Sequence, residues 1–162
     1  GATPICDAQK ESCIGQNTNL VTMNDWYQAN KTGYSNTKPS PAFADGSLVT
    51  VTGAFYISDY IIDGVTAILN AKNTYNTSIV ISNLKGVGSI SFDYKTWGSD
   101  SATLNITDGT TNTTLSVKSS DTTVKTFNYA FNNNNAKTVT ITPESKGSAG
   151  RVLIDNISWT SN

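Results

Sequence analysis

The sequence predicts an all-β fold, an antiparallel sandwich of two sheets, and three observations support this prediction. Most polar side chains are uncharged, because the 162 residues include 24 Thr, 18 Ser and 18 Asn. Thr favours the pleated surface of a sheet, whereas Asn and Ser favour turns. Glu, a good helix former, occurs only twice. Short runs that alternate apolar and polar residues recur between turn residues, as expected for strands with one buried face.

Turn residues divide the first half of the chain. Residues 1–19 lack a periodic pattern and are expected to form a leader or linker, so that the sandwich spans residues 20–162. Asp45-Gly46, Gly53, Asp63-Gly64 and the polar segment 70–76 separate the apolar runs that follow. The strands predicted in this half cover residues 48–51, 55–57, 60–62, 65–69 and 78–81.

Period-two alternation marks the strands of the second half, as in Ile90, Phe92 and Tyr94. Asp108-Gly109 is typical of a hairpin turn between two of these strands. The strands predicted here cover residues 89–97, 102–107, 113–118, 123–131, 137–142 and 151–159. Six aromatic side chains have the core-facing parity and are expected to pack inside: Phe92, Tyr94, Phe127, Tyr129, Phe131 and Trp159.

The last predicted strand changes its parity. Val152 and Ile154 have even numbers, whereas Ile157 and Trp159 have odd numbers. If all four side chains are buried, an extra residue must be inserted near Asp155, which describes a β-bulge. A bulge would redirect Asp155 and free a carbonyl, an arrangement suited to a structural cation. The alternative is that Asp155 forms a hydrogen bond with a neighbouring turn.

Length, charge and residue usage exclude several classes of protein. The chain is long enough for one sizeable domain. Its 11 basic and 12 acidic residues give a net charge of -1, which argues against nucleic-acid binding and provides no polybasic patch for a membrane surface. The chain has no apolar run long enough for membrane insertion. Because His is absent, Ser-His-Asp catalysis, Cys-His catalysis and His-ligated zinc are excluded within it.

Two cysteines, Cys6 and Cys13, lie close together in the polar leader. A short disulfide loop is the preferred interpretation, and it implies an oxidising compartment. Two unpaired thiols are the alternative, and a metal site is disfavoured because two sulfurs without His supply only half of a tetrahedron. We therefore expect a secreted or cell-surface protein whose signal peptide has been removed, or a module excised from a larger protein.

Three segments, residues 62–69, 84–95 and 150–159, resemble the jelly-roll β-sandwich modules of bacterial secreted enzymes and surface proteins. Carbohydrate-binding modules are one such group, and the C-terminal sandwiches of extracellular nucleases are another. The resemblance covers roughly residues 40–160 and implies a jelly-roll order of strands. In the carbohydrate-binding groups, an acidic residue of the closing strand often helps to hold a structural calcium. Asp155 matches that position, and Asp25 is a candidate partner near the start of the sandwich.

Trp97 is the aromatic residue that departs from the core pattern. It has the parity of Asp93 and Lys95, opposite to the core-facing residues of its strand. An exposed indole beside two charges is a candidate platform for stacking on a sugar, and packing under a loop is the alternative. Tyr56 and Tyr60 are candidates for a second platform. Arg151, the only arginine, could bind the carboxylate of an acidic polysaccharide or form an ordinary surface ion pair.

These observations predict a non-catalytic carbohydrate-binding module, tethered to a catalytic or surface domain, that binds polysaccharide by aromatic stacking and hydrogen bonds. The first alternative is an adhesion or structural domain that binds protein or acts as a spacer. The second is a glycoside hydrolase or lyase that uses a pair of carboxylates, such as Asp59 with Asp63 or Asp93 with Asp100.

Overall fold

The structure, a computed structural model, describes residues 18–21, 33–34, 36–57 and 61–161. Within these residues the chain forms eleven strands and no helix, so no helix there could cross a membrane. The strands are β1 (Thr18–Val21), β2 (Asn36–Pro39), β3 (Leu48–Tyr56), β4 (Thr66–Asn70), β5 (Ser78–Ser82), β6 (Val87–Thr96), β7 (Ala102–Thr107), β8 (Asn112–Val117), β9 (Lys125–Asn133), β10 (Val139–Pro143) and β11 (Arg151–Thr160). The predicted all-β fold is confirmed.

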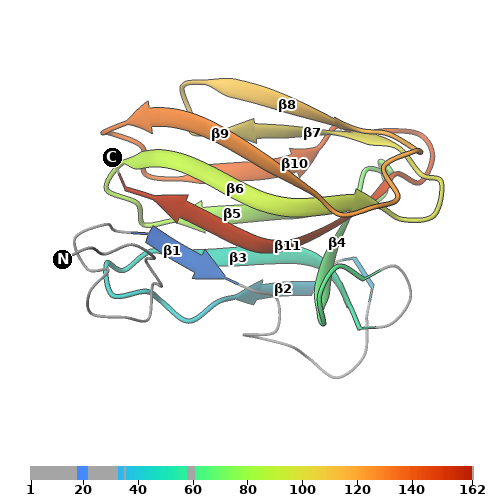
Figure 1. Ribbon diagram of the computed structural model, residues 1–162, viewed down its shortest axis with the longest axis horizontal. Coiled ribbons are helices and arrows are strands. Elements are labelled where there is room, and N and C mark those ends of the chain that lie inside the picture. The colour runs from blue at the N-terminus through green and yellow to red at the C-terminus, as the bar shows by residue number, and fades with distance from the viewer. Residues whose placement is uncertain (1–17, 22–32, 35, 58–60, 162) are drawn as a thin grey trace.

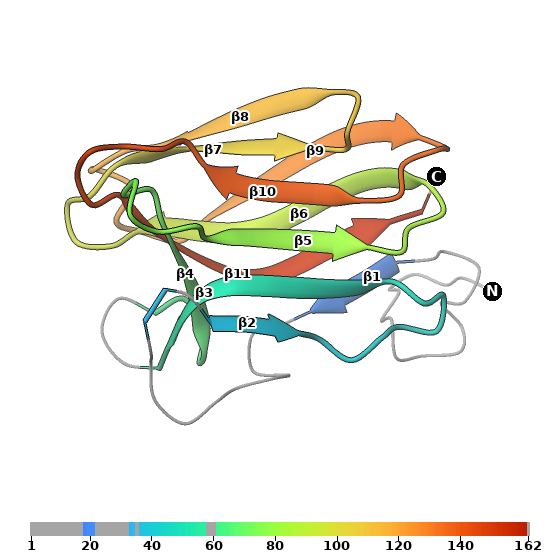
Figure 2. The same cartoon turned by 180° about the vertical axis from the view of Figure 1, so that it is seen from behind.

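The named strands pair antiparallel along one continuous path, in the order β8-β7-β10-β5-β3-β4-β11-β6-β9. Two further strands extend it, since β1 pairs with β11 and β2 pairs with β3. The path curls around itself, so that β6, β9 and β11 lie in front in Figure 1, whereas β5 and β10 come forward in Figure 2. Strand β3 joins the two parts, because residues 48–52 pair with β5 and residues 54–56 pair with β4.

Apolar side chains from both parts of the path fill one interior. Those with the lowest exposure include Val49, Val51, Ile79, Ile81, Leu104, Ile106, Val139 and Ile141 on one side and Ile90, Phe92, Val152, Ile154, Ile157 and Trp159 on the other. Alternate residues of strands such as β6 and β7 point into this core, as their burial patterns show. The predicted alternation is therefore the physical basis of the fold, because it lets each strand bury one face.

The predicted bulge in the closing strand is confirmed. The pairing of β11 with β6 shifts register between Asp155 and Ser158, and Asn156 has a φ of 54°. All four apolar residues that suggested the bulge are buried. Because two of them have even numbers and two have odd numbers, they can share the buried face only if the strand contains an inserted residue.

Several details of the sequence prediction differ from the structure, and the short strands β1 and β2 were not predicted. Residues 48–51 and 55–57 were expected as separate strands, but β3 runs unbroken from Leu48 to Tyr56. A strand was also expected at residues 60–62, and this prediction is wrong for Ile61 and Ile62, because neither residue belongs to a strand. Of the six aromatic residues expected in the core, the three on β9 are half-buried, because β9 is at the end of the strand path. These are Phe127, Tyr129 and Phe131, of which Phe127 and Phe131 still pack against the core, and the other three are buried.

Candidate functional site

A second, smaller apolar cluster lies on the outer side of the sheet. Ala54, Ile68 and Leu153 are fully buried there, although they do not belong to the main core. Backbone pairing aligns them in one row across three strands, because Ala54 is opposite Ile68 and Ile68 is opposite Leu153. Half-buried side chains pack over this row: Tyr34, Tyr56, Ile62 and Trp97. An apolar floor of this kind holds aromatic rings at the surface of the molecule.

Trp97 packs over this floor directly after the end of β6. Its ring centroid lies 4.9 Å from that of Tyr56, in an edge-to-face arrangement at 69°. The guanidinium carbon of Arg151 lies 5.3 Å from the centroid of the Trp97 ring, within the range of a cation–π contact. The structure therefore brings together three residues that the sequence suggested separately: Tyr56, Trp97 and Arg151. Trp97 lies outside the main core, as its parity predicted, and it also packs against neighbours, as the alternative proposed.

Arg151 forms an ion pair with Asp100, which was the alternative for this arginine. Its Nε donates to Oδ2 of Asp100 over 2.7 Å and its Nη2 donates to Oδ1 over 3.3 Å. The backbone N–H of Arg151 donates to the same carboxylate over 3.1 Å. Burial alone would raise the pKa of the Asp100 carboxyl, but the hydrogen bonds and charge of Arg151 outweigh burial and hold that pKa below its usual value. The pair therefore stays ionised at neutral pH.

A tight turn places Asp100 opposite Arg151. The backbone N–H of Asp100 donates to the carbonyl of Trp97 over 3.0 Å, and the Thr96 hydroxyl donates to the carbonyl of Asp100. Gly98 has a φ of 59°, a left-handed conformation that glycine adopts at little cost. Because the turn starts at Trp97 and ends at Asp100, it fixes the indole and the carboxylate relative to each other.

The aromatic surface continues from Tyr34 to Tyr75. These two rings lie 4.8 Å apart between centroids. Burial raises the pKa of Tyr34, which the charge of nearby Arg151 partly opposes. Tyr75 is 39% exposed and borders a cleft of about 310 Å³. Amides and hydroxyls line this cleft beside the ring: Asn70, Asn73, Asn76, Thr77, Ser78 and Thr142.

Sequence reasoning missed Tyr75 as a site residue, although a local signal was present. Segment 70–76 was treated as a turn because it contains three asparagines, yet a tyrosine stands among them. An aromatic ring within a run of amides is the mixture that a polar ligand with an apolar face requires.

Two other predicted site residues, Asp93 and Lys95, lie on the same face of β6 as Trp97. The Asp93 carboxylate accepts hydrogen bonds from the Thr126 hydroxyl over 2.7 Å and from the Asn156 amide over 2.9 Å. Lys95 is half-buried and pairs across the sheet with Leu153 of the apolar floor. Tyr60, Asp25, Cys6, Cys13 and most of the expected leader lie outside the described residues, so the expectations for them stay predictions.

Asp155, the proposed calcium ligand, is fully buried and stands opposite Asp93 in the pairing of β11 with β6. Its Oδ1 accepts a hydrogen bond of 2.8 Å from the backbone N–H of Asn156 within the bulge. Calcium requires about six to eight oxygen ligands. The described part of the chain contains no group of three or more His, Cys, Asp or Glu side chains that could hold a metal. The calcium site at Asp155 therefore stays a prediction, and its suggested partner Asp25 lies outside the described residues.

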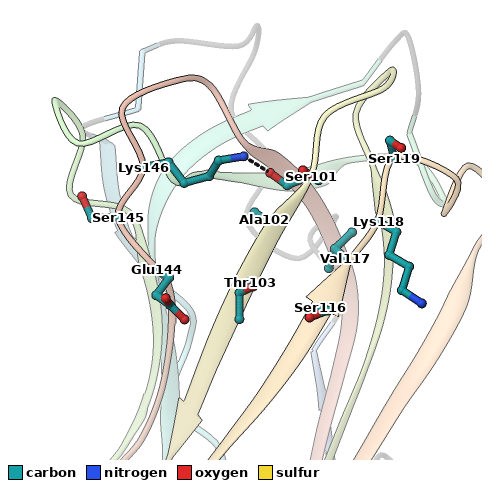
Figure 3. A pocket seen from close by; sticks show the side chains of 10 residues that line it. All are labelled: Ser101, Ala102, Thr103, Ser116, Val117, Lys118, Ser119, Glu144, Ser145 and Lys146. Atoms are coloured by element: carbon teal, nitrogen blue, oxygen red, sulfur yellow. Dashed lines mark hydrogen bonds between the residues drawn. The ribbon is translucent and has the colours of Figure 1, made fainter.

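A wider cleft of about 550 Å³ lies where β7 begins and β8 ends. Figure 3 shows Lys146 extending across it to the backbone carbonyl of Ser101, which accepts its hydrogen bond over 2.8 Å. Its lining consists of small, hydroxyl-bearing and charged side chains without an aromatic ring. Because stacking needs an aromatic face, the surface around Trp97 is the better candidate for a sugar site.

Comparisons with known proteins place the fold. No protein-family model and no curated protein matches the sequence. Among solved structures, the chain is similar to the K2 cleaved adhesin domain of Lys-gingipain, with 11% identity, a TM-score of 0.53, and coverage of 88% of this chain and 99% of that chain.

Other structural neighbours come from carbohydrate-active proteins. A family two carbohydrate esterase from Cellvibrio japonicus has 14% identity and a TM-score of 0.49 over 90% of this chain, which spans 34% of the esterase chain. A family 29 carbohydrate-binding module has 10% identity and a TM-score of 0.41, with coverage of 90% of this chain and 92% of the module. At 11% identity, the similarity to the adhesin domain supports the expected resemblance at the level of the fold alone.

Proposed function

We propose that this chain is a non-catalytic carbohydrate-binding module that holds polysaccharide on the aromatic surface formed by Tyr34, Tyr56, Tyr75 and Trp97. The observation that carries the proposal is the position of Trp97, whose ring lies half-exposed on an apolar floor outside the main core. Sugar rings have apolar C–H faces that stack on such rings, and hydroxyls at their edges that need polar partners. The amide-lined cleft beside Tyr75 supplies those partners next to an exposed ring.

Preorganisation supports binding at this surface. The Trp97 indole is held by Tyr56 at its edge, by the Arg151 guanidinium over its ring and by the turn that ends at Asp100. Side chains that are already ordered lose little entropy when a ligand binds, so more of the contact energy appears as affinity.

The proposal also covers the order of strands within the fold and the place where the module acts. The two parts of the curled strand path, which β3 joins, form the two sheets of a sandwich. The strands of this sandwich follow the jelly-roll order that such modules share. The module acts outside the cell, tethered to a catalytic or surface domain, and raises the effective concentration of that partner on its polysaccharide. A non-catalytic role is supported for one of the two carboxylate pairs suggested for catalysis, since Asp93 and Asp100 are bound by separate partners. Asp59 of the other pair lies outside the described residues.

Affinity electrophoresis against a panel of soluble polysaccharides tests the function. We expect at least one polysaccharide to retard the wild-type protein, and Trp97→Ala to weaken that affinity at least about tenfold, as removal of a central aromatic contact does. Tyr129→Ala is the matched control, because it removes another half-buried ring that lies on β9, outside this surface. Retardation by no polysaccharide would refute the proposal and favour the adhesion or spacer role. Equal binding by wild type and Trp97→Ala would refute the assignment of the site.

A further inference from the structure

We propose that Asp100 determines the charge specificity of the aromatic surface, so that the site accepts uncharged glycans and excludes acidic ones. The inference rests on the proposed function and names the class of its ligand. Arg151 is the cation over the Trp97 ring, and by itself it would attract the carboxylate of a uronic acid. The structure shows that Arg151 already forms an ion pair with a carboxylate of the protein, that of Asp100.

Asp100 occupies one of the two edges with which Arg151 could bind an acidic sugar. Arginine recognises carboxylates with two parallel N–H donors. Here Nε and Nη2 both donate to Asp100, one to each carboxylate oxygen. The acidic side chain therefore takes the side-on position at which the carboxylate of a ligand would bind.

Asp100 also neutralises the charge beside the indole. Its carboxylate is mostly buried, with 16% of the side chain exposed, and its pKa is held below the usual value, so it remains negative at neutral pH. A uronate stacked on Trp97 would approach this negative charge as well as the guanidinium. Because the ion pair has no net charge, it does not attract a uronate as a lone guanidinium would, and it does not repel a neutral sugar.

The turn makes this arrangement durable. Asp100 cannot rotate away without breaking its three hydrogen bonds to Arg151, and its backbone is tied to Trp97 and Thr96. A second cation, Lys146, is engaged elsewhere, because its ammonium donates to the Ser101 carbonyl.

The test compares each neutral polysaccharide that binds with the same polymer after oxidation of its C6 hydroxymethyl groups to carboxylates. Wild type should bind the neutral polymer at least about tenfold more tightly than the oxidised one at pH 7 and low salt. Asp100→Asn frees the guanidinium and should bind the oxidised polymer at least about tenfold more tightly than wild type does, with an affinity that falls as salt is added. The double variant Asp100→Asn/Arg151→Gln should lose that gain.

Glu144→Gln is the matched control, because it changes the net charge by the same amount at the wider cleft and should gain nothing. Equal affinity of wild type for both polymers would overturn the inference while leaving carbohydrate binding intact, as would a folded Asp100→Asn that gains no affinity. A gain that persists without Arg151 would also overturn it. If Asp100→Asn does not fold, the wild-type comparison alone decides the matter. If wild type binds none of the neutral polymers, the proposed function fails and this inference fails with it.

Discussion

Gly53 lies where β3 leaves one part of the strand path and enters the other, and replacing it by Ala should destabilise the protein. A Cβ atom built at this position lies 2.6 Å from the backbone carbonyl oxygen of Ile68. That distance is about 0.8 Å shorter than the 3.4 Å at which ordinary contact begins, and the atom that it meets is backbone. Relief therefore requires β4 to move away from β3, which disturbs the apolar floor formed by Ala54, Ile68 and Leu153.

The expected loss of stability is moderate. Overpacking of this kind costs about 1–3 kcal/mol. Replacing glycine also lowers the entropy of the unfolded chain, which offsets about 0.4–1 kcal/mol, since Gly53 does not have a positive φ. The net decrease in the free energy of unfolding should be about 1–2 kcal/mol, or about 2–8 °C in Tm for a chain of this length.

Thermal and urea unfolding, followed by circular dichroism, measure this decrease. Gly147→Ala is the matched control, because a Cβ there meets no atom within 4 Å and its φ is not positive. We expect this control to be as stable as wild type or slightly more stable. If Gly53→Ala were as stable as Gly147→Ala, the close approach of β3 and β4 would not be the reason for a glycine at this position.

Two further predictions concern titration and metal. Asp108 accepts hydrogen bonds from the backbone N–H groups of Thr110 and Thr111 and from the Asn133 amide. Burial raises the pKa of the Asp108 carboxyl, but these hydrogen bonds outweigh burial, so that the pKa lies below its usual value. A lowered folded pKa gives stability that is present above the unfolded value, about pH 4, and lost as pH falls through the folded pKa. Urea unfolding across this range should therefore show a shallower acid loss in Asp108→Asn than in wild type, and identical slopes would contradict the assignment. If Asp155 helps to bind calcium, a chelator should lower Tm and added calcium should restore it, whereas an unchanged Tm would exclude a stabilising ion.

The fold was predictable because its main signal is local. Period-two alternation over Ile90, Phe92 and Tyr94 reports which face of one strand is buried, and the bulge at Asp155 follows from the same parity argument. The signal was less accurate where burial depends on neighbours. Phe127 has core parity and packs against the core, but it is only half-buried, because its strand has a partner on only one side. Ile61 and Ile62 look like strand residues, although the structure places them outside the strands.

The candidate site was predictable only in its parts. The parity of Trp97 separated it from the core of its strand, and Tyr56 and Arg151 were recognised as suitable residue types. Their convergence required the pairing of β3 with β4, of β4 with β11 and of β11 with β6, which joins segments far apart in the sequence. Tyr75 had a local signal, a tyrosine among asparagines, but the cleft and the Tyr34 ring beside it come from the tertiary structure.

The amino-acid order by itself determined that the chain forms sheets, which side chains face inward, and that an indole at position 97 belongs to the outer face. Only tertiary structure decided that Arg151 is neutralised by Asp100 and that four aromatic rings form one surface. The reason is physical. Alternation along a strand depends on neighbours one or two residues away, whereas an ion pair or a ring contact depends on which distant strands become adjacent.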